Sequence, residues 1–371
     1  MKKITVILYG IFLLLFTIFS YVFIDPNLLY LKGFYSGFAF SDRLLATIFY
    51  ASLVVIFFIF YGIFIYLGYK KKINLKEIFM LLGMIAVILF ISYPAMLSYD
   101  IFNYVATSKV LFFYHENPYV VMPFEFTRDP LLLFTHAANK IALYGPFWIL
   151  LAGIPYFLGF GNFLITLFSF KFLIAIFYLG TAFLIWKMSK NIIPVILFSF
   201  NPLVVIETLV SGHNDIVMIF FILFSFFLLT KNKIIFAVLF FILSILIKYA
   251  TILLVPIFLF IVWRLIRKKG VDWAKVYFFS SLVMLIAFLL SPLREEIYSW
   301  YAIWFIPFAF LVLNKKILLS VSIVFSLSLL LRYIPYMLTG TYSGQTPFMK
   351  EIISFIPPVL VLAYYGLKNK V

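Results

Sequence analysis

Long apolar runs divide the chain into candidate helices, and short charged segments separate them. Most runs approach the roughly 20 residues that a helix needs to cross a bilayer. They do not alternate as barrel strands do, so the pattern predicts membrane-spanning helices. We expect an uncleaved first helix over residues 5–24 and further spans near 44–68, 78–97, 163–186, 192–210, 215–230, 276–292, 299–313, 317–334 and 351–366.

Two apolar segments do not fit a single crossing. The run 234–263 is too long, and we expect two short helices joined near Lys248–Tyr249. The segment 145–160 is short and begins with Gly145–Pro146, which predicts an interfacial or re-entrant helix. The fold class is therefore an all-α polytopic membrane protein with about 11–12 transmembrane helices. Because no internal repeat or low-complexity linker is visible, we expect residues 1–371 to form a single transmembrane domain.

Composition and charge agree with this class and add an orientation. The chain is 66% hydrophobic and 11% charged, a balance that a water-exposed surface could not carry. A net charge of +16 would suggest nucleic acid in a soluble protein, but here it indicates cytoplasmic Lys and Arg, and we expect no nucleic-acid partner. One topology puts most of the 29 basic residues inside with both termini. The same topology leaves every acid except Glu77 and Asp272 outside or near an outer helix end, which predicts chemistry on the outer face of the cell membrane.

The longest outer segment, residues 98–144, is too long to be a simple connection. Its first part can form an amphipathic helix in the membrane interface, with Ile101 and Phe102 facing lipid. The chain has no cysteine, which excludes disulfides and thiolate metal sites. Its three histidines lack close metal-ligand spacing. We therefore expect an outer catalytic loop without a zinc site.

Asp100 is the sharpest candidate for catalysis, because it lies where a predicted span ends and the interfacial helix begins. A carboxylate held there by two rigid elements could accept the proton of an incoming hydroxyl group. An equally good interpretation from sequence is that Asp100, together with Ser98, caps the helix and complements its positive end.

A family resemblance runs through this part of the chain. The motifs that carry it are Tyr99–Tyr104, His115–Tyr119, Asp129–Leu131, Tyr144–Trp148, Asn201–Leu203 with Glu207, Gly212–Asp215, Ser244–Tyr249 and Trp300–Pro307. In order and spacing they resemble GT-C-type glycosyltransferases, with the closest likeness to polyprenyl-phosphomannose-dependent α-1,6-mannopyranosyltransferases. The resemblance implies sugar transfer from a lipid phosphate carrier outside the cytoplasm, with Asp100 as the base. Many members of the wider class carry two acids in this loop, whereas Tyr99 and Ile101 flank Asp100 here, so a divalent cation is left open.

Such a reaction needs positive charge for the departing phosphate and an apolar groove for the isoprenoid. Lys248 is a donor phosphate-binding candidate because a lysine in an apolar run is costly unless it is paired or faces a wet cavity, although it could also snorkel. Arg294 and Arg332 are further phosphate candidates, for which solvated or interfacial charge is the simpler interpretation.

The remaining candidates would bind the sugar or the acceptor. They are Tyr104, Asn117, Tyr119, Asp129, Tyr144, Glu207, His213, Asn214, Asp215, Trp300 and Tyr301. Several have simpler alternatives: Asn214 or Asp215 can cap the next helix, and Trp300 and Tyr301 can belong to an interfacial aromatic belt. Glu207 is harder to explain as solvated, and we expect it to pair with Lys171 or Lys248.

We therefore predict an inverting membrane glycosyltransferase that moves a sugar, expected to be mannose, from a polyprenyl-phosphate donor to a glycan or glycolipid acceptor on the outer face. The first alternative is a transporter or flippase of lipid-linked sugars, favoured by Lys171, Glu207 and Lys248 within apolar runs. The second is a non-catalytic scaffold of a cell-envelope complex.

Overall fold

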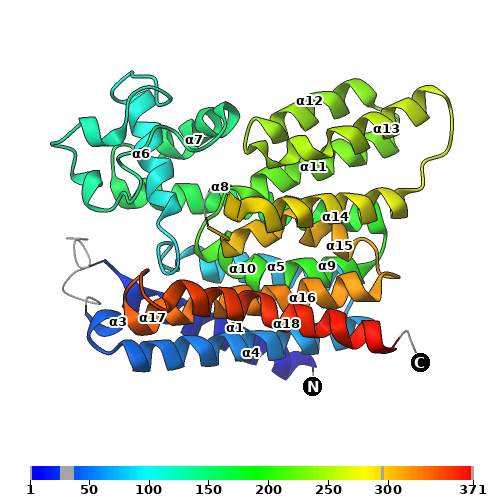
Figure 1. Ribbon diagram of the computed structural model, residues 1–371, viewed down its shortest axis with the longest axis horizontal. Coiled ribbons are helices and arrows are strands. Elements are labelled where there is room, and N and C mark those ends of the chain that lie inside the picture. The colour runs from blue at the N-terminus through cyan, green and yellow to red at the C-terminus, as the bar shows by residue number, and fades with distance from the viewer. Residues whose placement is uncertain (1, 26–36, 294–295, 369–371) are drawn as a thin grey trace.

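Helices make up most of the described residues. A computed structural model describes residues 2–25, 37–293 and 296–368, and within these ranges it contains no strand (Figure 1). The all-α prediction is confirmed. The longer helices are α1 (Lys2–Ser20), α4 (Arg43–Tyr69), α5 (Leu75–Phe90), α6 (Asp100–Phe112), α7 (Pro146–Leu158), α8 (Phe163–Ser189), α11 (Asp215–Thr230), α12 (Ile234–Ile245), α13 (Val255–Ile266), α14 (Trp273–Leu290), α16 (Lys316–Leu331) and α18 (Thr346–Lys368).

Seven helices among the described residues are long and apolar enough to cross a membrane, which makes this a multi-pass membrane protein. Their ranges are Lys3–Phe23, Arg43–Tyr69, Phe163–Ser189, Tyr249–Ile266, Trp273–Leu293, Lys316–Thr339 and Thr346–Lys368. A bent pair of short helices would make eight. This is fewer than the 11–12 spans expected from about 20 apolar residues each, because several long apolar runs fold into short or broken helices.

The predicted span 192–210 breaks at a proline. It consists of α9 (Ile192–Ser199) followed by the helical segment Pro202–Val210, and the two are bent by 59°. The second part comprises α10 (Pro202–Val205) and the π-helix η4 (Ile206–Val210). Pro202 cannot donate a backbone hydrogen bond, and the side chain of Asn201 accepts from the amides of Leu203 and Val204 instead. The part of the run after the break carries Glu207, which is buried.

Two other predicted spans are wrong in their helical extent. Residues 299–313 form the 3₁₀ helix η7 (Ser299–Trp304) and the short helix α15 (Ile306–Phe310), both largely buried in protein, rather than one spanning helix. The predicted span 78–97 ends early, because α5 stops at Phe90 and the following turns lead to α6. Apolar content alone does not separate such buried irregular segments from a lipid-facing helix.

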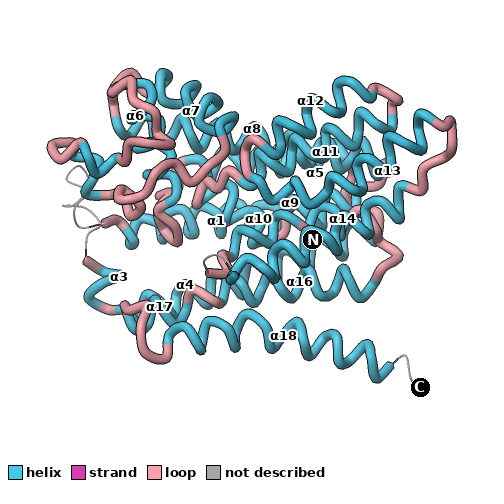
Figure 2. The backbone as a smooth tube through the Cα atoms, turned by 45° about the horizontal axis from the view of Figure 1, so that its top comes forward, coloured by secondary structure: helices cyan, strands magenta, loops and turns pink. Residues whose placement is uncertain are grey.

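The elements form a bundle with the chain termini toward one end and α6, α7 and α17 (Ile334–Thr339) toward the other (Figure 1). In the turned view, α18 lies along one side of the molecule (Figure 2). Helix α11 packs against α8 and α12, α16 packs against α18, and α1 packs against α5. The short elements that complete the chain are η1 (Tyr21–Phe23), α3 (Phe38–Ser41), η2 (Pro123–Glu125), η3 (Pro130–Leu133), η5 (Tyr249–Leu254) and η6 (Ser291–Leu293).

Helix α6 is a buried helix of the loop 98–144, which corrects the prediction that its apolar face lies in lipid. Ile101 and Phe102 are fully buried, and α6 packs against α7 and α8. Phe102 contacts the rings of Phe134 and Phe163. Residues of the loop and of α7 and α8 therefore bury the apolar face of α6 that was predicted to contact lipid, and α6 is held by protein.

Lys171 anchors the turn that leads to α6. This lysine of α8 is 2% exposed, and its ammonium donates to the carbonyls of Leu89 and Ser92 at 2.9 and 2.5 Å and to the Ser92 hydroxyl at 2.7 Å. The Lys171 side chain thereby donates to carbonyls at the end of α5 and in the turn that follows it. The expected pairing of Lys171 with Glu207 is therefore wrong.

We expect Lys171→Met to destabilise the protein by about 1–3 kcal/mol, because the buried Ser92 carbonyl loses its donor. The Leu89 carbonyl keeps the Ser92 amide and hydroxyl as donors. A clear fall in the thermal melting temperature of the detergent-solubilised protein would show this. Lys187→Met is the matched control, since this half-buried lysine of the same helix lies over the rings of Phe183 and Trp186. Equal melting temperatures for the two variants would contradict the anchoring role.

Candidate active site

Two cavities meet beside Asp100 at the end of the bundle opposite the termini. The first cavity, about 270 Å³, lies between α6, α17 and the segment 296–300. The second cavity, about 600 Å³, lies between the end of the loop 98–144, η5 and α14. The residues that line both are Asp100, Asn103, His136, Tyr298 and Trp300. Among the described residues, Asp100 is the one carboxylate on both walls.

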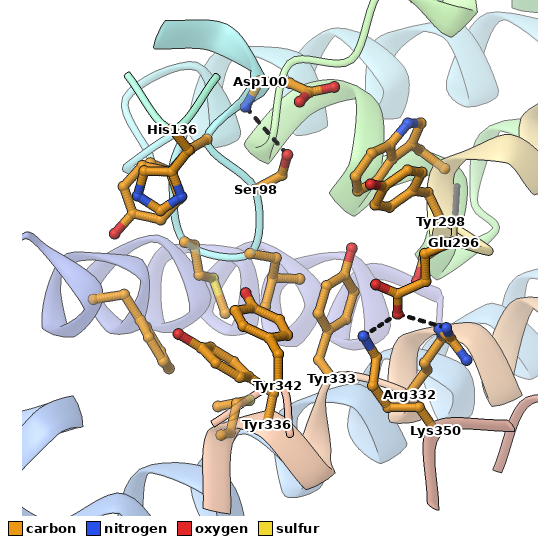
Figure 3. Close-up of a pocket in the computed structure, with 18 of the residues that line it drawn as sticks. Ser98, Asp100, His136, Glu296, Tyr298, Arg332, Tyr333, Tyr336, Tyr342 and Lys350 are labelled. Carbon is orange, nitrogen blue, oxygen red and sulfur yellow. Dashed lines mark hydrogen bonds and ion pairs between the residues drawn. The ribbon is translucent and has the colours of Figure 1, made fainter. Parts of the chain in front are cut away.

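Asp100 is the first residue of α6, after the N-cap residue Tyr99. Its backbone amide donates to the Ser98 hydroxyl at 3.3 Å. The Asp100 side chain is 25% exposed and touches His213 at 3.4 Å. Figure 3 shows Asp100 across the first cavity from Glu296 and Arg332. The carboxylate is therefore both held by protein and open to a ligand.

A buried turn, Gly212–Asp215, stands behind Asp100. Its His213 lies between two acids, with Nδ1 at 3.4 Å from Asp100 Oδ2 and Nε2 at 3.3 Å from Glu207 Oε2. The imidazole also stacks on Trp300, with ring centroids 3.8 Å apart. Glu207 accepts a hydrogen bond from the Tyr333 hydroxyl at 2.9 Å, so its partners are His213 and Tyr333 and the expected pairing with Lys248 is wrong. His213 of this turn therefore fixes the Asp100 carboxylate from the protein interior.

Burial lowers the pKa of His213, but contacts with Asp100 and Glu207 raise it more strongly, and the net pKa is about 9. The imidazole is therefore protonated at neutral pH, and its charge lies between two carboxylates. Gly212 makes the turn possible, because its φ of +76° is in the region that favours glycine and an added Cβ would lie 3.0 Å from Ile101.

The same turn holds Lys248. Asp215, at the start of α11, accepts hydrogen bonds from the Lys248 ammonium at 2.8 and 3.0 Å and another from the Trp304 indole. The ammonium also lies 4.5 Å from the centroid of the Tyr301 ring. Lys248 follows the end of α12, where two short helices were predicted to join, and that break is confirmed. The lysine is paired and lines the second cavity, so it does not simply snorkel.

Helix α7 begins directly against this break. The amides of Gly145 and Phe147 donate to the carbonyls of Ile247 and Leu246 at 3.0 and 2.9 Å. A Cβ on Gly145 would lie 2.2 Å from the Leu246 oxygen, so only glycine fits. Tyr144–Gly145–Pro146 therefore joins the loop to the segment that carries Lys248, beyond its ordinary role as the start of a helix.

The far wall of the first cavity carries buried cations. Arg332 is 5% exposed, which corrects its interpretation as a solvated charge. It bonds Glu296 at 2.7 Å and Ser354 at 3.1 Å, and Lys350 bonds the same oxygen of Glu296 (Figure 3). Beside this cluster the rings of Tyr336 and Tyr342 stack on each other, with their centroids 4.0 Å apart.

Several predicted binding residues do not reach either cavity. Asn117 is exposed, the Tyr119 hydroxyl donates to the Tyr144 carbonyl, and Asp129 binds Lys109 and Tyr114 and caps η3. These three stabilise the loop. Tyr104 and Asn214 are buried against each other, with the backbone amide of Asn214 donating to the Tyr104 hydroxyl at 3.2 Å.

The other predicted residues fall into three groups. Tyr144, Trp300 and Tyr301 line a cavity. Glu207, His213 and Asp215 lie buried behind the cavity walls, and Arg294 lies outside the described residues.

Sequence reasoning missed Glu296, Lys350, Tyr333 and Trp304. Trp304 follows Trp300 and Tyr301 in an aromatic stretch, and it is buried and bonds Asp215. Glu296 is adjacent to other charges in the sequence, and Lys350 lies far from it along the chain. Their convergence depends on α16, α17 and α18 folding back together, which no local pattern indicates. Within the described ranges, no group of three His, Cys, Asp or Glu side chains could hold a metal ion.

Comparison with known families decides the identity of the chain. The family model described as alpha-(1->6)-mannopyranosyltransferase, N-terminal domain, matches residues 27–266, more than half of the 371 residues. The chain belongs to this family. The family is one of glycosyltransferases, and this mannosyltransferase therefore acts on a sugar donor and an acceptor in a membrane setting. No curated protein and no solved structure gave a significant match.

The matched region of the mannosyltransferase includes Asp100, the turn Gly212–Asp215 and Lys248. The cation cluster of Glu296, Arg332 and Lys350 lies beyond it, in the part of the chain that the family model does not cover. The first cavity thus joins a wall inside the matched region to a wall outside it.

The raised pKa of His213 predicts a loss of stability at alkaline pH. Its folded pKa of about 9 exceeds the ordinary value of 6.5, so its stabilising charge is fully present below pH 6.5 and is lost as pH rises through 9. Linkage puts the effect on the order of 3 kcal/mol. Between pH 7 and 10 we expect the melting temperature of the wild type to fall more than that of His213→Gln.

His136→Gln is the matched control, because partial burial lowers the pKa of His136 and this imidazole is uncharged throughout that range. Its melting profile is expected to follow the wild type. Parallel profiles for wild type and His213→Gln would show that His213 is not charged in the folded protein.

Proposed function

We propose that this enzyme transfers mannose from a polyprenyl-phosphate carrier to a hydroxyl group of a glycan or glycolipid, with Asp100 as the general base. The observation that carries the proposal is the convergence of Asp100 and Lys248 on the second cavity, each held by the turn Gly212–Asp215. A base and a phosphate-binding cation are the two groups that this displacement requires from the protein.

The second cavity suits the lipid-linked donor. Lys248 lies on its wall, and its third ammonium hydrogen remains for a phosphate oxygen while the Asp215 carboxylate holds the other two. The same cavity is lined by the exposed apolar side chains of Ile252, Leu253 and Leu290. Such side chains on a membrane protein face lipid, which gives an isoprenoid tail a lateral route to the phosphate position.

The first cavity suits the acceptor, because it meets the second at Asp100 and is lined by tyrosines. An acceptor hydroxyl in this position would give its proton to the Asp100 carboxylate while its oxygen attacks the anomeric carbon. The bond from the anomeric carbon to the phosphate oxygen breaks, and the electron pair leaves with the polyprenyl phosphate. A single displacement of this kind inverts the configuration of the anomeric carbon.

His213 is a positioning residue in this scheme. Its protonated imidazole contacts Asp100 from the side opposite the cavities and is itself fixed by Glu207 and Trp300. The contact fixes the position of the Asp100 carboxylate beside the cavities. The proposal assigns no residue to a divalent cation.

The orientation of the enzyme follows from its charges. Both termini lie toward the end of the bundle opposite α6 and α17 (Figure 1), and residues of these two helices line the first cavity. The Lys- and Arg-rich segments predict that the termini are cytoplasmic. The cavities would then open to the outer face of the cell membrane. Of the acids that first suggested chemistry there, Asp100 and Glu296 line the first cavity.

Asp100→Asn is expected to lower kcat by about 10²–10⁴-fold, because the amide cannot accept the acceptor proton. The measurement is transfer of labelled mannose from polyprenyl-phosphate mannose to a membrane acceptor. Glu116→Gln is the control, since it changes an exposed acid of the same loop. Full transfer by a folded Asp100→Asn variant would remove Asp100 from the role of base.

Lys248→Gln is expected to lower kcat and raise KM for the donor, because the phosphate loses a charged contact in both the bound and the departing state. Lys140→Gln is the matched control, since this exposed lysine lines the same cavity. Unchanged donor KM and kcat in Lys248→Gln would place the phosphate elsewhere.

A further inference from the structure

The cation cluster of the first cavity has more positive than negative charge. Arg332 and Lys350 are 5% and 9% exposed, and both bind the same oxygen, Oε1 of Glu296. The Glu296 side chain, by contrast, is 41% exposed. One carboxylate therefore neutralises two nearly buried cations, an arrangement that favours a second anion, because a buried charge is costly without a partner.

The other described residues that line the cavity do not remove this imbalance. Arg43 adds a third cation to the wall. Among the described residues that line the cavity, the acids are Glu296 and Asp100, and Asp100 already contacts His213. The tyrosines of this wall, which include Tyr298, Tyr336 and Tyr342, bring ring faces next to the cluster. Cations that adjoin aromatic faces suit an anionic group attached to a sugar.

Glu296 is placed to be exchanged for such a group. It belongs to the non-helical segment 296–298, and its carboxylate is held by Arg332 and Lys350 rather than by neighbours in the chain. Arg332 caps the end of α16 and is also bonded to Ser354, and Lys350 lies in α18. A carboxylate on a non-helical segment can turn toward solvent while the two cations stay in place.

We propose that Arg332 and Lys350 form an anion-binding position that takes the phosphate group of a lipid phosphate, and that the Glu296 carboxylate occupies this position until the ligand displaces it. The phosphate belongs either to the acceptor or to the carrier released by the donor. The inference rests on the proposed function for its role in transfer, but the binding position is a separate property of residues outside the region matched by the family model.

A binding measurement tests the position without catalysis. Dodecyl phosphate is titrated by calorimetry into the full-length protein in dodecyl maltoside, with a Lys248→Gln background so that the proposed donor position does not contribute. Adding Lys350→Gln is expected to weaken binding about tenfold, the loss of one charge-assisted contact. Adding Glu296→Gln is expected to tighten binding about threefold or more, because the competing carboxylate loses its charge.

The opposite signs of the two changes distinguish displacement from a merely structural cluster. Lys316→Gln in the same background is the control, since this lysine lines a different cavity, and it is expected to leave binding unchanged. Binding that disappears with Lys248→Gln alone, that is indifferent to Lys350, or that weakens in Glu296→Gln would overturn the proposal.

Transfer kinetics then identify the source of the phosphate. If Lys350→Gln raises KM for the acceptor alone, the acceptor carries the phosphate; if it weakens product inhibition by polyprenyl phosphate alone, the released carrier binds there. No change in either quantity would overturn the role in transfer. An absence of any transfer by the wild-type protein would contradict the proposed function and leave the calorimetric result standing.

Discussion

The geometry of the site depends on one buried turn, Gly212–Asp215, whose two charged side chains contact different elements. His213 contacts Asp100 at 3.4 Å, and Asp215 bonds Lys248 at 2.8 Å. These partners belong to the loop helix α6 and to the break after α12, which are distant in sequence. Because buried charges are costly without partners, the turn determines where both elements can lie. The proposed base and the proposed phosphate-binding cation are thereby held at one cavity by neighbouring residues.

The elements around the turn limit its freedom further. Gly212 has a φ of +76°, and Gly145 lets α7 approach the Leu246 carbonyl more closely than any side chain would allow. Lys171 holds the end of α5 from the other side. The hydrogen bonds of Lys171 give the carbonyls of Leu89 and Ser92 partners inside the protein. Catalysis by electrostatic preorganisation requires such fixed groups, since they do not reorganise when charge develops.

The sequence was sufficient to predict the helical membrane fold, the family and the break at Lys248. Each of these depends on features of neighbouring residues, namely the length of apolar runs and the order of short motifs. It did not predict the 3₁₀ and short helices of residues 299–310 or the burial of α6, since apolar residues look alike whether protein or lipid covers them. Local sequence patterns also did not predict which charged side chains pair. Glu207 was assigned to the wrong lysines, and its partner is His213. Arg332 appeared solvated because tertiary packing brings its partner Glu296 to it. Asn117, Tyr119 and Asp129 lay in the right loop, but their side chains support it from outside the cavities.

The central claim is that Asp100 stands between a donor in the second cavity and an acceptor in the first. The most direct measurement is an experimental structure of the enzyme with a non-transferable polyprenyl phosphonate analogue of the donor. The account predicts the phosphonate at Lys248, the lipid tail along Ile252 and Leu290, and the anomeric carbon facing Asp100. A phosphonate bound at Arg332 and Lys350, with the sugar turned away from Asp100, would contradict it.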